Sequence, residues 1–524
     1  MLDGSGSGKS SAYSIPNAYQ CLGSYIFTDP KGELYDRTAG YLKSKGYEIK
    51  VLNLVHPQYS DGYNPLMHIS SELDVDVIAN TIVKGQKTDS GSDPYWDDMA
   101  EMLLKALIYY LIATRPEEEQ NLASCAELVR AANANGGSNL LTELISALPY
   151  DHPARMYYKS IEIAPEKTYG SILSSLQSKL GKFDSKEIAE LTSIDTIDFE
   201  QIGNRKTAVY VISSDTHTAY DFLLTIFFSQ MIQQLYDYAD KNGGQLKEQT
   251  FFILDEFANI GKIPDFDKKI STSRSRKISF SVILQNVDQL EAVYEKSYET
   301  IMGNCDTHVF LGSNSFKTVE YFSKQLGEKT IDRESTSINR DKTRHKTGYS
   351  DSEQIMARAL MTPDELRRLD NDQCIIFVKG LKPIKANKFY YFKHPMAREM
   401  KAVEISHNDI GEIERGTWRK YNPYNPYVEE KEESNKQSDL KVESLDDLFE
   451  DIEPENKVPK PEIKSQENKT VQTVAEPDFL NLDDLKIEDD APVLPQTNSD
   501  DDYDLQKELE AKFDELFGPI DEDD

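Results

Sequence analysis

Residues 3–10 read Asp-Gly-Ser-Gly-Ser-Gly-Lys-Ser. Three alternating glycines before a Lys-Ser pair predict a tight turn whose backbone N–H groups converge on phosphate oxygens at the start of a helix. In such a loop Lys9 reaches the β- and γ-phosphates of a nucleotide, and the Ser10 hydroxyl is a ligand for Mg²⁺. The residues that would line the phosphates are Gly4, Ser5, Gly6, Ser7 and Gly8. The stretch therefore predicts a site for ATP and Mg²⁺.

The first position of this loop pattern, normally glycine, is Asp3 here. A strand normally precedes such a loop and supports it. The chain starts at Met1, so we expect that strand to be missing and the N-terminus to be truncated. The alternative is a flexible Ser/Gly-rich start that contains a lysine by chance.

A second motif argues against chance. The apolar run Phe251-Phe252-Ile253-Leu254 ends in Asp255-Glu256, as a buried strand ending in two carboxylates would. At the end of such a strand, Asp255 can hold the metal of a bound nucleotide, and Glu256 can orient and deprotonate an attacking water. The two motifs together predict a nucleotide hydrolase.

The remaining pattern predicts an α/β fold. Strand-like runs at 24–28 and 47–54 flank a helical segment at 34–45, which indicates a βαβ unit and a mostly parallel sheet. Further strands are predicted at 207–212, 251–254, 278–284, 307–311, 374–378 and 388–392, and a long helix at 220–238. These runs lack polar alternation, so we expect the sheet to be covered on both faces.

Three segments depart from this pattern. Residues 93–197 carry helical spacing only, which predicts an inserted all-α domain. Residues 331–352 are polar without periodicity, and we expect a mobile loop that projects from the core. We divide the chain into 1–92 and 201–420, the two parts of the nucleotide-binding domain, 93–200, the all-α insert, and 421–524, a tail.

The tail carries most of the charge. Residues 421–524 hold 33 Asp and Glu against 10 Lys and no Arg, which is −23 of a net −32. We expect it to be disordered, with short apolar anchors: Leu-Asp-Asp-Leu at 445–448 and 482–485, and an amphipathic helix at 503–517. Because the acid is concentrated in the tail, the acidic composition does not exclude a nucleic-acid partner.

Cysteine, histidine and hydropathy give weaker indications. The four cysteines and eight histidines are scattered, so neither a disulfide framework nor a zinc site is predicted. The longest apolar runs, 103–113 and 222–232, are shorter than the ~20 residues that cross a bilayer.

Three further features could serve the nucleotide or its substrate. Arg274 or Arg276 could reach the γ-phosphate on a neighbouring subunit, and we favour Arg276, although a solvated basic helix end is the alternative. Gln285, at a strand end, could bond the γ-phosphate or the attacking water, or be a routine polar cap. Residues 29–33 lie at a strand's carboxyl end, where open α/β sheets bind ligands, although their composition alone would indicate a turn.

Two basic segments could neutralise DNA phosphates without reading bases, although such charge runs are usually solvated surface. The first holds Lys262, Lys268, Lys269, Arg274, Arg276 and Lys277, and the second Arg333, Arg340, Lys342, Arg344 and Lys346.

The chain resembles the VirD4/TraG-type coupling ATPases of conjugative type IV secretion. The resemblance covers about residues 3–400. It rests on Gly-Ser-Gly-Ser-Gly-Lys-Ser at 4–10, Thr-Asp-Pro-Lys-Gly-Glu at 28–33, Asp-Pro-Tyr-Trp at 93–96, Ile-Leu-Asp-Glu-Phe-Ala-Asn-Ile-Gly at 253–261, Ser-Arg-Ser-Arg at 273–276 and Leu-Gln-Asn at 284–286.

This resemblance implies a RecA-like motor domain that carries an all-α domain and assembles as a hexamer at the cytoplasmic face of the bacterial cell membrane. Such proteins recruit a relaxase bound to single-stranded DNA and pass it to the secretion channel. Their acidic tail contacts relaxosome proteins, and transmembrane helices precede their phosphate loop. We expect those helices to be missing here because of truncation or a split gene.

Two alternative functions remain. One is a DNA translocase of chromosome segregation or packaging with the same motor core, against which the helical insert argues. The other is a non-hydrolysing adaptor that binds relaxosome proteins through its tail and insert.

Overall fold

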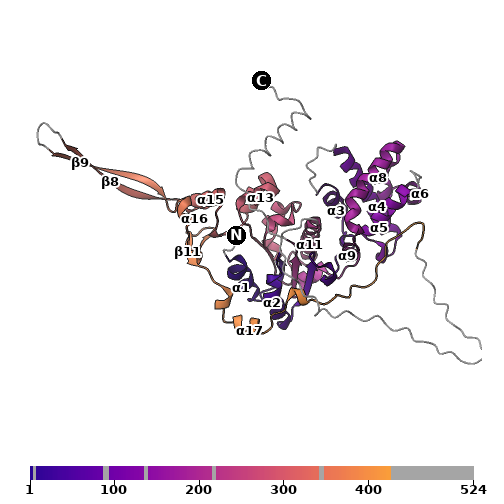
Figure 1. The fold of residues 1–524 in the computed structure, drawn as a ribbon, viewed down its shortest axis with the longest axis horizontal. Helices are drawn as coiled ribbons and strands as arrows, with labels where there is room; N and C mark the ends of the chain where they lie inside the picture. Colours follow the sequence, from indigo (N-terminus) through magenta and orange to yellow (C-terminus); the bar gives the residue numbers. More distant parts are fainter. Residues whose placement is uncertain (4–7, 86–93, 135–139, 215–219, 341–346, 427–524) are drawn as a thin grey trace, which may run out of the picture. The chain divides into compact units, whose positions relative to one another are not determined.

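The structure is a computed structural model, shown in Figure 1, and it describes residues 1–3, 8–85, 94–134, 140–214, 220–340 and 347–426. Within these residues two sheets and their covering helices form the predicted α/β fold. The helix predicted at 503–517 and both Leu-Asp-Asp-Leu motifs lie outside the described residues.

The central sheet has five parallel strands in the order β3-β4-β2-β5-β6. All five carboxyl ends therefore lie at one edge, the edge at which such sheets bind ligands. The strands β2 and β4 are buried along their whole length. The bounds are Ser24–Thr28 for β2, Glu48–Asn53 for β3, Thr207–Ile212 for β4, Thr250–Leu254 for β5 and Ile278–Val282 for β6.

A second sheet has the order β1-β7-β10-β11, in which only β1 and β7 are parallel. Its strands are β1 (Leu2–Asp3), β7 (Thr307–Gly312), β10 (Gln373–Val378) and β11 (Ile384–Asn387).

The strand before the phosphate loop was expected to be missing, and that prediction is wrong, since β1 supplies two residues of it. The Met1 amine donates to the Val282 carbonyl at 2.7 Å, and the Leu284 amide donates to the Met1 carbonyl at 3.0 Å. This is the bonding of parallel neighbours. The chain start therefore lies beside the end of β6 and joins the two sheets.

Opposite faces of the central sheet are covered by different helices. Tyr25 and Phe27 of β2 pack with α1 (Ile15–Ala18) and α2 (Glu33–Ser44) in one core, whereas Ile26 packs in the other core with α11 (Asp221–Lys241). Successive residues of a strand point to opposite faces, so this split follows from the period of two. The lack of polar alternation along these strands is explained by burial on both sides.

The helices predicted between 93 and 197 are present. They pack around α4, and α3 (Glu72–Lys84) lies against them (Figure 1). Their bounds are Pro94–Thr114 for α4, Leu122–Ala134 for α5, Leu140–Ser146 for α6, Pro153–Glu162 for α7, Glu166–Leu180 for α8 and Lys186–Leu191 for α9. A short helix, α10 (Phe199–Asn204), then leads into β4. Among the described residues, no helix is both long and apolar enough to cross a membrane.

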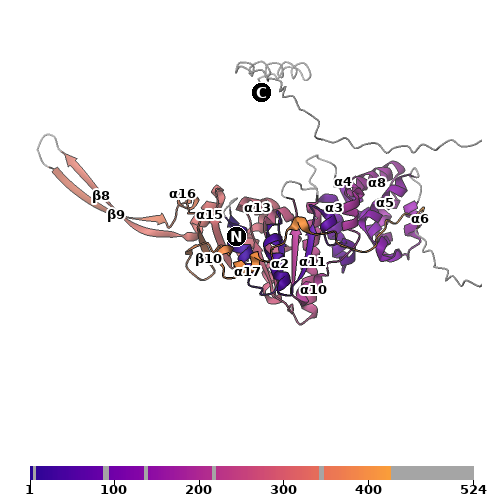
Figure 2. The same ribbon diagram turned by 60° about the horizontal axis from the view of Figure 1, so that its bottom comes forward.

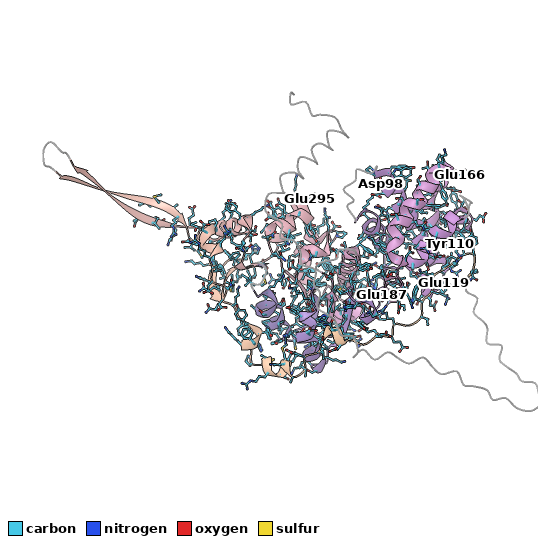
Figure 3. The ribbon with its side chains drawn as sticks, in the orientation of Figure 1. Asp98, Tyr110, Glu119, Glu166, Glu187 and Glu295 are labelled. Atoms are coloured by element: carbon cyan, nitrogen blue, oxygen red, sulfur yellow. The ribbon has the colours of Figure 1, made fainter. Side chains whose placement is uncertain are left out.

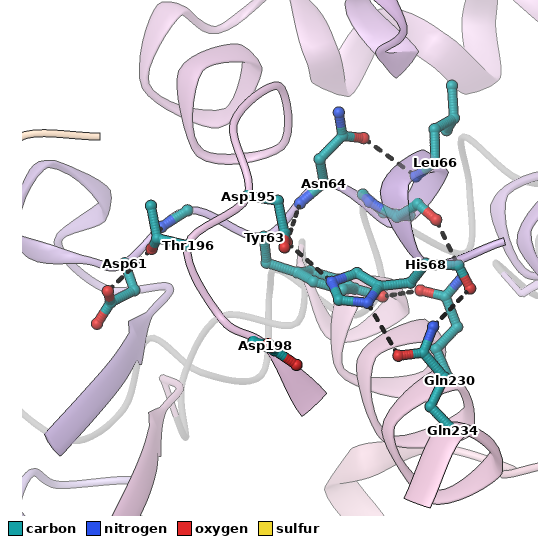
Figure 4. A network of polar contacts seen from close by, with 12 residues as sticks. Asp61, Tyr63, Asn64, Leu66, His68, Asp195, Thr196, Asp198, Gln230 and Gln234 are labelled. Carbon is teal, nitrogen blue, oxygen red and sulfur yellow. Dashed lines mark hydrogen bonds and ion pairs between the residues drawn. The ribbon is translucent and has the colours of Figure 1, made fainter. Parts of the chain in front are cut away.

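A polar network joins the segments that enter and leave this helical region (Figure 4). The His68 ring bonds Asp195 Oδ1 at 2.8 Å and Gln234 Oε1 at 3.2 Å, and Tyr63 donates to Gln230 Oε1 at 2.6 Å. Gln230 and Gln234 both belong to α11, which packs on the sheet. Buried polar groups bonded in this way fix both chain crossings to the core helix.

A C-terminal segment, which we call the 404–426 strap, runs from the sheet toward the helical region. At its start the His407 amide and ring Nδ1 bond Asp36 Oδ1 at 2.6 and 2.8 Å. Further along, the buried Arg415 guanidinium donates to the carbonyls of Ser60 (2.8 Å) and Pro57. The strap is thus anchored first to α2 and then to the loop after β3.

The far end of the strap lies on the helical region, where Figure 3 labels Tyr110 and Glu119. Arg419 Nε donates to Glu119 Oε1 at 2.8 Å. The Tyr421 ring is buried, and its hydroxyl lies 3.5 Å from the Tyr110 hydroxyl. The Arg115 guanidinium lies over this ring, 4.1 Å from its centroid. The predicted start of the tail at residue 421 therefore falls inside a packed segment.

Two further predictions are wrong. The polar segment 331–352 was expected to be a loop, but β8 (Glu328–Arg340) and β9 (Thr347–Ala359) pair as an antiparallel ribbon that projects beyond α15 (Phe316–Leu326), as Figures 1 and 2 show. The strand predicted at 388–392 lies earlier, as β11, and Tyr391–Lys393 is a 3₁₀ turn. The sequence of the ribbon shows no apolar alternation, so its hydropathy gave no sign of the strand pairing.

Candidate nucleotide site

The two motifs quoted first meet at the carboxyl edge of the central sheet. Lys9 Nζ lies 2.9 Å from Asp255 Oδ1 and 2.5 Å from Glu256 Oε1. The side chains are 20% exposed for Lys9, 6% for Asp255 and 16% for Glu256, so the three charges share a secluded site. Thr28 Oγ1, at the end of the adjacent β2, donates to the Asp255 carbonyl at 2.7 Å and fixes the strand end.

The charges in this cluster support one another. Burial acts to lower the pKa of Lys9, but the charge of Asp255 and the bond to Glu256 outweigh it and raise that pKa. Burial raises the pKa of Asp255, and the neighbouring lysine opposes the rise. The amine thus stays an ammonium near neutral pH, the form that binds phosphate.

Glu256 is held in an uncommon conformation. Its backbone has φ 50° and ψ 45°, the left-handed region, which turns the chain sharply after β5. Gln285 Nε2 donates to both carboxylate oxygens of Glu256, at 2.8 and 2.9 Å. The backbone N–H of Gln285 in turn donates to Gln289 Oε1 at 3.1 Å. Gln285 is therefore hydrogen-bonded to the Glu256 carboxylate, and its contact with the γ-phosphate or the attacking water stays a prediction.

Thr28 and Gln289 are members of this cluster that the sequence reasoning missed. Thr28 ends a strand predicted to lie in the same sheet, and a hydroxyl at a shared strand edge is the signal that was available. Gln289 belongs to α13 (Val287–Tyr294), a helix that the sequence pattern did not single out.

The phosphate loop is described in part. Gly8 has φ +89°, which only glycine adopts without strain, and the Ser11 hydroxyl donates to its carbonyl. Lys9 precedes a π-helical turn, Ser10–Ser14, that leads into α1. Ser10 thus stands directly after the lysine at a helix start, as the motif requires. Gly4, Ser5, Gly6 and Ser7 lie outside the described residues.

The turn at 29–33 lies at the same sheet edge. Asp29 is 2% exposed, and its Oδ2 accepts from the Tyr35 amide at 2.8 Å, at the start of α2. Burial raises the pKa of Asp29 to about 7. Gly32 has φ +71°, and a Cβ there would lie 2.4 Å from His407 Nδ1, so the turn is in close contact with the strap.

The two candidate arginines differ in their surroundings. Arg276 forms a bidentate pair with Asp240, at 2.9 and 3.0 Å, and its guanidinium lies 4.8 Å from the Tyr236 ring centre. The Arg274 side chain is 94% exposed and lies 3.8 Å from Asp306. Arg276 is therefore committed within its own chain, whereas Arg274 faces solvent.

The predicted basic segments are only partly assembled. Lys262, Lys268 and Lys277 are exposed, but Lys268 pairs with Asp265 at 2.6 Å. Lys269 is half-buried, and burial lowers its pKa. In the second segment Lys342, Arg344 and Lys346 lie outside the described residues, and only the backbone of Arg333 and Arg340 is described, in β8. A contact with DNA stays a prediction.

A parallel sheet flanked by helices, with a glycine-lysine loop facing paired acids, defines a phosphate-loop NTPase core of the RecA-like type. The chain belongs to a family within this class: the family model described as Type IV secretory system Conjugative DNA transfer matches residues 1–413.

Curated relatives agree with this assignment. The conjugal transfer protein TraG of Escherichia coli is 25% identical over 434 residues, which cover 76% of this chain and 67% of TraG. The protein VirD4 of Rhizobium rhizogenes is 24% identical over 419 residues, covering 76% of this chain and 59% of VirD4. The chain is therefore a VirD4/TraG-type coupling protein that spans about two thirds or less of the length of these relatives.

Solved structures are similar in fold. The unbound bacterial conjugative coupling protein TrwBdeltaN70 aligns with a TM-score of 0.50 and 17% identity, covering 75% of this chain and 85% of that one. The complex of the plasmid coupling protein TrwB with the ATP analogue ADPNP aligns with a TM-score of 0.50 and 16% identity, covering 75% and 86%.

Proposed function

We propose that this protein is an ATP-driven coupling protein that recruits a relaxase bound to single-stranded DNA and delivers it to a type IV secretion channel. The observation that carries the ATPase part is the cluster of Lys9, Asp255, Glu256 and Gln285 at the carboxyl edge of the sheet. The similar TrwB complex contains a non-hydrolysable ATP analogue, which supports a nucleotide in this fold.

Each residue has a distinct task in this proposal. Lys9 binds the β- and γ-phosphates, so one of its present bonds to a carboxylate must be exchanged for a phosphate oxygen. Ser10 and Asp255 would hold Mg²⁺, which neutralises phosphate charge. Glu256 accepts a proton from water as the water oxygen bonds the γ-phosphorus and the bond to the β-phosphate oxygen breaks, giving ADP and phosphate.

We assign the role of the arginine that acts on a neighbouring subunit to Arg274. The sequence reasoning favoured Arg276, but its planar fork already holds both oxygens of Asp240. The exposed Arg274 side chain is available for an adjacent copy. An arginine that acts on a neighbouring copy requires an oligomer. We propose that this oligomer is the expected homo-hexamer at the cytoplasmic face of the membrane.

The partners follow from the family and from charge. An acidic segment with short apolar anchors suits basic relaxosome proteins, so the part of the tail at 427–524 is the proposed recruiting segment. The helical region and the exposed lysines near Lys262 are the proposed contacts with the DNA-bound substrate and the channel.

The decisive experiment measures ATP turnover by the purified chain with and without single-stranded DNA, beside capture of its cognate relaxase. We expect turnover that single-stranded DNA stimulates and that Glu256→Gln abolishes, together with relaxase capture. Turnover without relaxase capture favours a DNA translocase. If the wild-type chain and the Glu256→Gln chain are equally inactive but still bind their partners, the non-hydrolysing adaptor is favoured.

A further inference from the structure

A stacked aromatic pair stands beside the phosphate loop. The rings of Tyr390 and Phe392 lie 5.2 Å apart between centroids with an angle of 7° between their planes. A Cβ at Gly8 would lie 3.3 Å from Tyr390 Cε1, so this tyrosine ring touches the loop itself. Phe392 is 60% exposed, although phenylalanine is most often buried.

The pair is held rigidly. Tyr390 donates its hydroxyl to Asp372 Oδ1 at 2.9 Å. A 3₁₀ turn, Tyr391–Lys393, follows. The ring of Tyr391, which separates the pair in sequence, is edge-on to Tyr19 with 6.3 Å between the ring centroids. This ring packs with the core that contains α1, the helix after the phosphate loop. The exposed ring plane of Phe392 is therefore fixed relative to the loop.

The position matches one end of a nucleotide. Loop N–H groups bind the α- and β-phosphates, and the lysine reaches the β- and γ-phosphates. Lys9 contacts Asp255 and Glu256, so that side of the loop is the γ-phosphate side. Tyr390 approaches the loop at Gly8, and it is anchored to Asp372, the residue directly before β10 of the second sheet. The sugar and base extend from the α-phosphate, at the opposite end of the triphosphate from the γ-phosphate, so an exposed aromatic plane beside the loop is a candidate surface for the base.

We propose that Tyr390 and Phe392 form the platform on which the purine base of the nucleotide stacks. The base lies on the exposed face of Phe392, and Tyr390 supports Phe392 from behind. The proposal rests on the proposed ATPase function and adds the residues that bind the base. Stacking accounts for such a site because a flat apolar ring loses little conformational freedom when it binds another ring.

The test separates the base from the phosphates. Affinities of the full chain for Mg-ATP and for Mg-tripolyphosphate are measured by calorimetry. Phe392→Ala is expected to weaken Mg-ATP binding by roughly tenfold or more, the loss expected for one stacked base, and to leave Mg-tripolyphosphate binding unchanged. Phe392→Trp should retain ATP affinity, since a flat ring is kept.

Two controls make the outcome specific. Phe389 is 50% exposed but lies edge-on to His394, so Phe389→Ala should leave both affinities unchanged. Lys9→Ala should weaken the binding of both Mg-ATP and Mg-tripolyphosphate. Equal losses of ATP and tripolyphosphate in Phe392→Ala, or no loss of either, would overturn the platform and leave the ATPase proposal standing. Failure of the wild-type chain to bind either ligand would overturn the proposed function itself.

Discussion

Lys9 and Asp255 lie 246 positions apart in the sequence, and a 2.9 Å contact joins their Nζ and Oδ1 atoms. The phosphate loop and the strand β5 therefore meet at one sheet edge. Had the two residues been far apart, the glycine-rich segment would carry no interpretation as a nucleotide site. Their proximity makes the roles of the surrounding residues testable one at a time.

Glu256→Gln should abolish hydrolysis and preserve binding. The amide cannot accept the proton of the attacking water, and loss of a general base costs about 10²–10⁴-fold in turnover. Steady-state ATPase assays and ATP affinity should be measured in parallel. The exposed Glu412 provides the control, and Glu412→Gln should be fully active. Undiminished turnover in Glu256→Gln would remove Glu256 from the mechanism.

Alanine variants of the two arginines should differ in their free energy of unfolding and in their ATP turnover. Arg276→Ala removes a bidentate ion pair and a cation–π contact, and we expect its free energy of unfolding in urea to fall by about 1 kcal/mol. Arg274→Ala should unfold like the wild type but lose at least about 100-fold in turnover, since an arginine acting in trans contributes this much or more.

Mixing the Arg274→Ala chain with the Glu256→Gln chain provides the complementary measurement. A chain with Arg274→Ala keeps its own Glu256, and a chain with Glu256→Gln keeps its own Arg274. If Arg274 acts on a neighbour, mixed assemblies regain part of the activity that each variant lacks. Activity of the mixture no greater than that of its parts would show that Arg274 does not act in trans.

Stability should depend on pH through Asp29. Its pKa is about 7 in the folded chain and near 3.8 when unfolded. Between these values the unfolded chain releases a proton that the folded chain retains, so the free energy of unfolding falls as pH rises, by about 1.4 kcal/mol per unit of pKa difference. Asp29→Asn should flatten this slope in urea unfolding between pH 5 and 8.

The exposed Asp151 supplies the control for this slope, because Asp151→Asn should leave it intact. An Asp29→Asn chain whose stability falls with pH as steeply as the wild type would show that Asp29 titrates normally.

Gly32→Ala should destabilise the fold more than Gly46→Ala. Both glycines have positive φ, so both alanines are strained, but only at Gly32 does the added Cβ meet His407. We expect a difference of about 1 kcal/mol or more, measured by chemical unfolding. Truncating His407 to alanine should recover part of that difference in a double-mutant cycle. Equal costs at both glycines would show that the turn and the strap do not press on each other.

The predictable parts of the fold are the strands whose burial produces a recognisable hydrophobic pattern in the sequence. The strands at Ser24–Thr28 and Thr207–Ile212 were predicted with their observed bounds because every residue in them is buried. The β8–β9 ribbon was missed because its residues are polar and its pairing is made by backbone bonds, which leave no trace in hydropathy.

The site was predictable where one motif defines one role. The loop lysine and the acids after β5 follow from local pattern, and so does a glutamine at a strand end. Local pattern could not show that Arg276 is paired within its own chain, because its partner Asp240 lies 36 residues away in α11. The contact of Tyr390 with the loop was equally hidden, since hundreds of residues separate the two.

The route of the 404–426 strap decides where the acidic segment is attached. Among the described residues the last strand, β11, ends at Asn387. The chain continues to the helical region, where Asn422 Nδ2 donates to Glu127 Oε1 of α5 at 3.4 Å. Residues 427–524 therefore depart from beside α4 and α5. If this segment recruits a partner as proposed, the covalent attachment point of that partner's tether is the helical region and not the carboxyl edge of the central sheet.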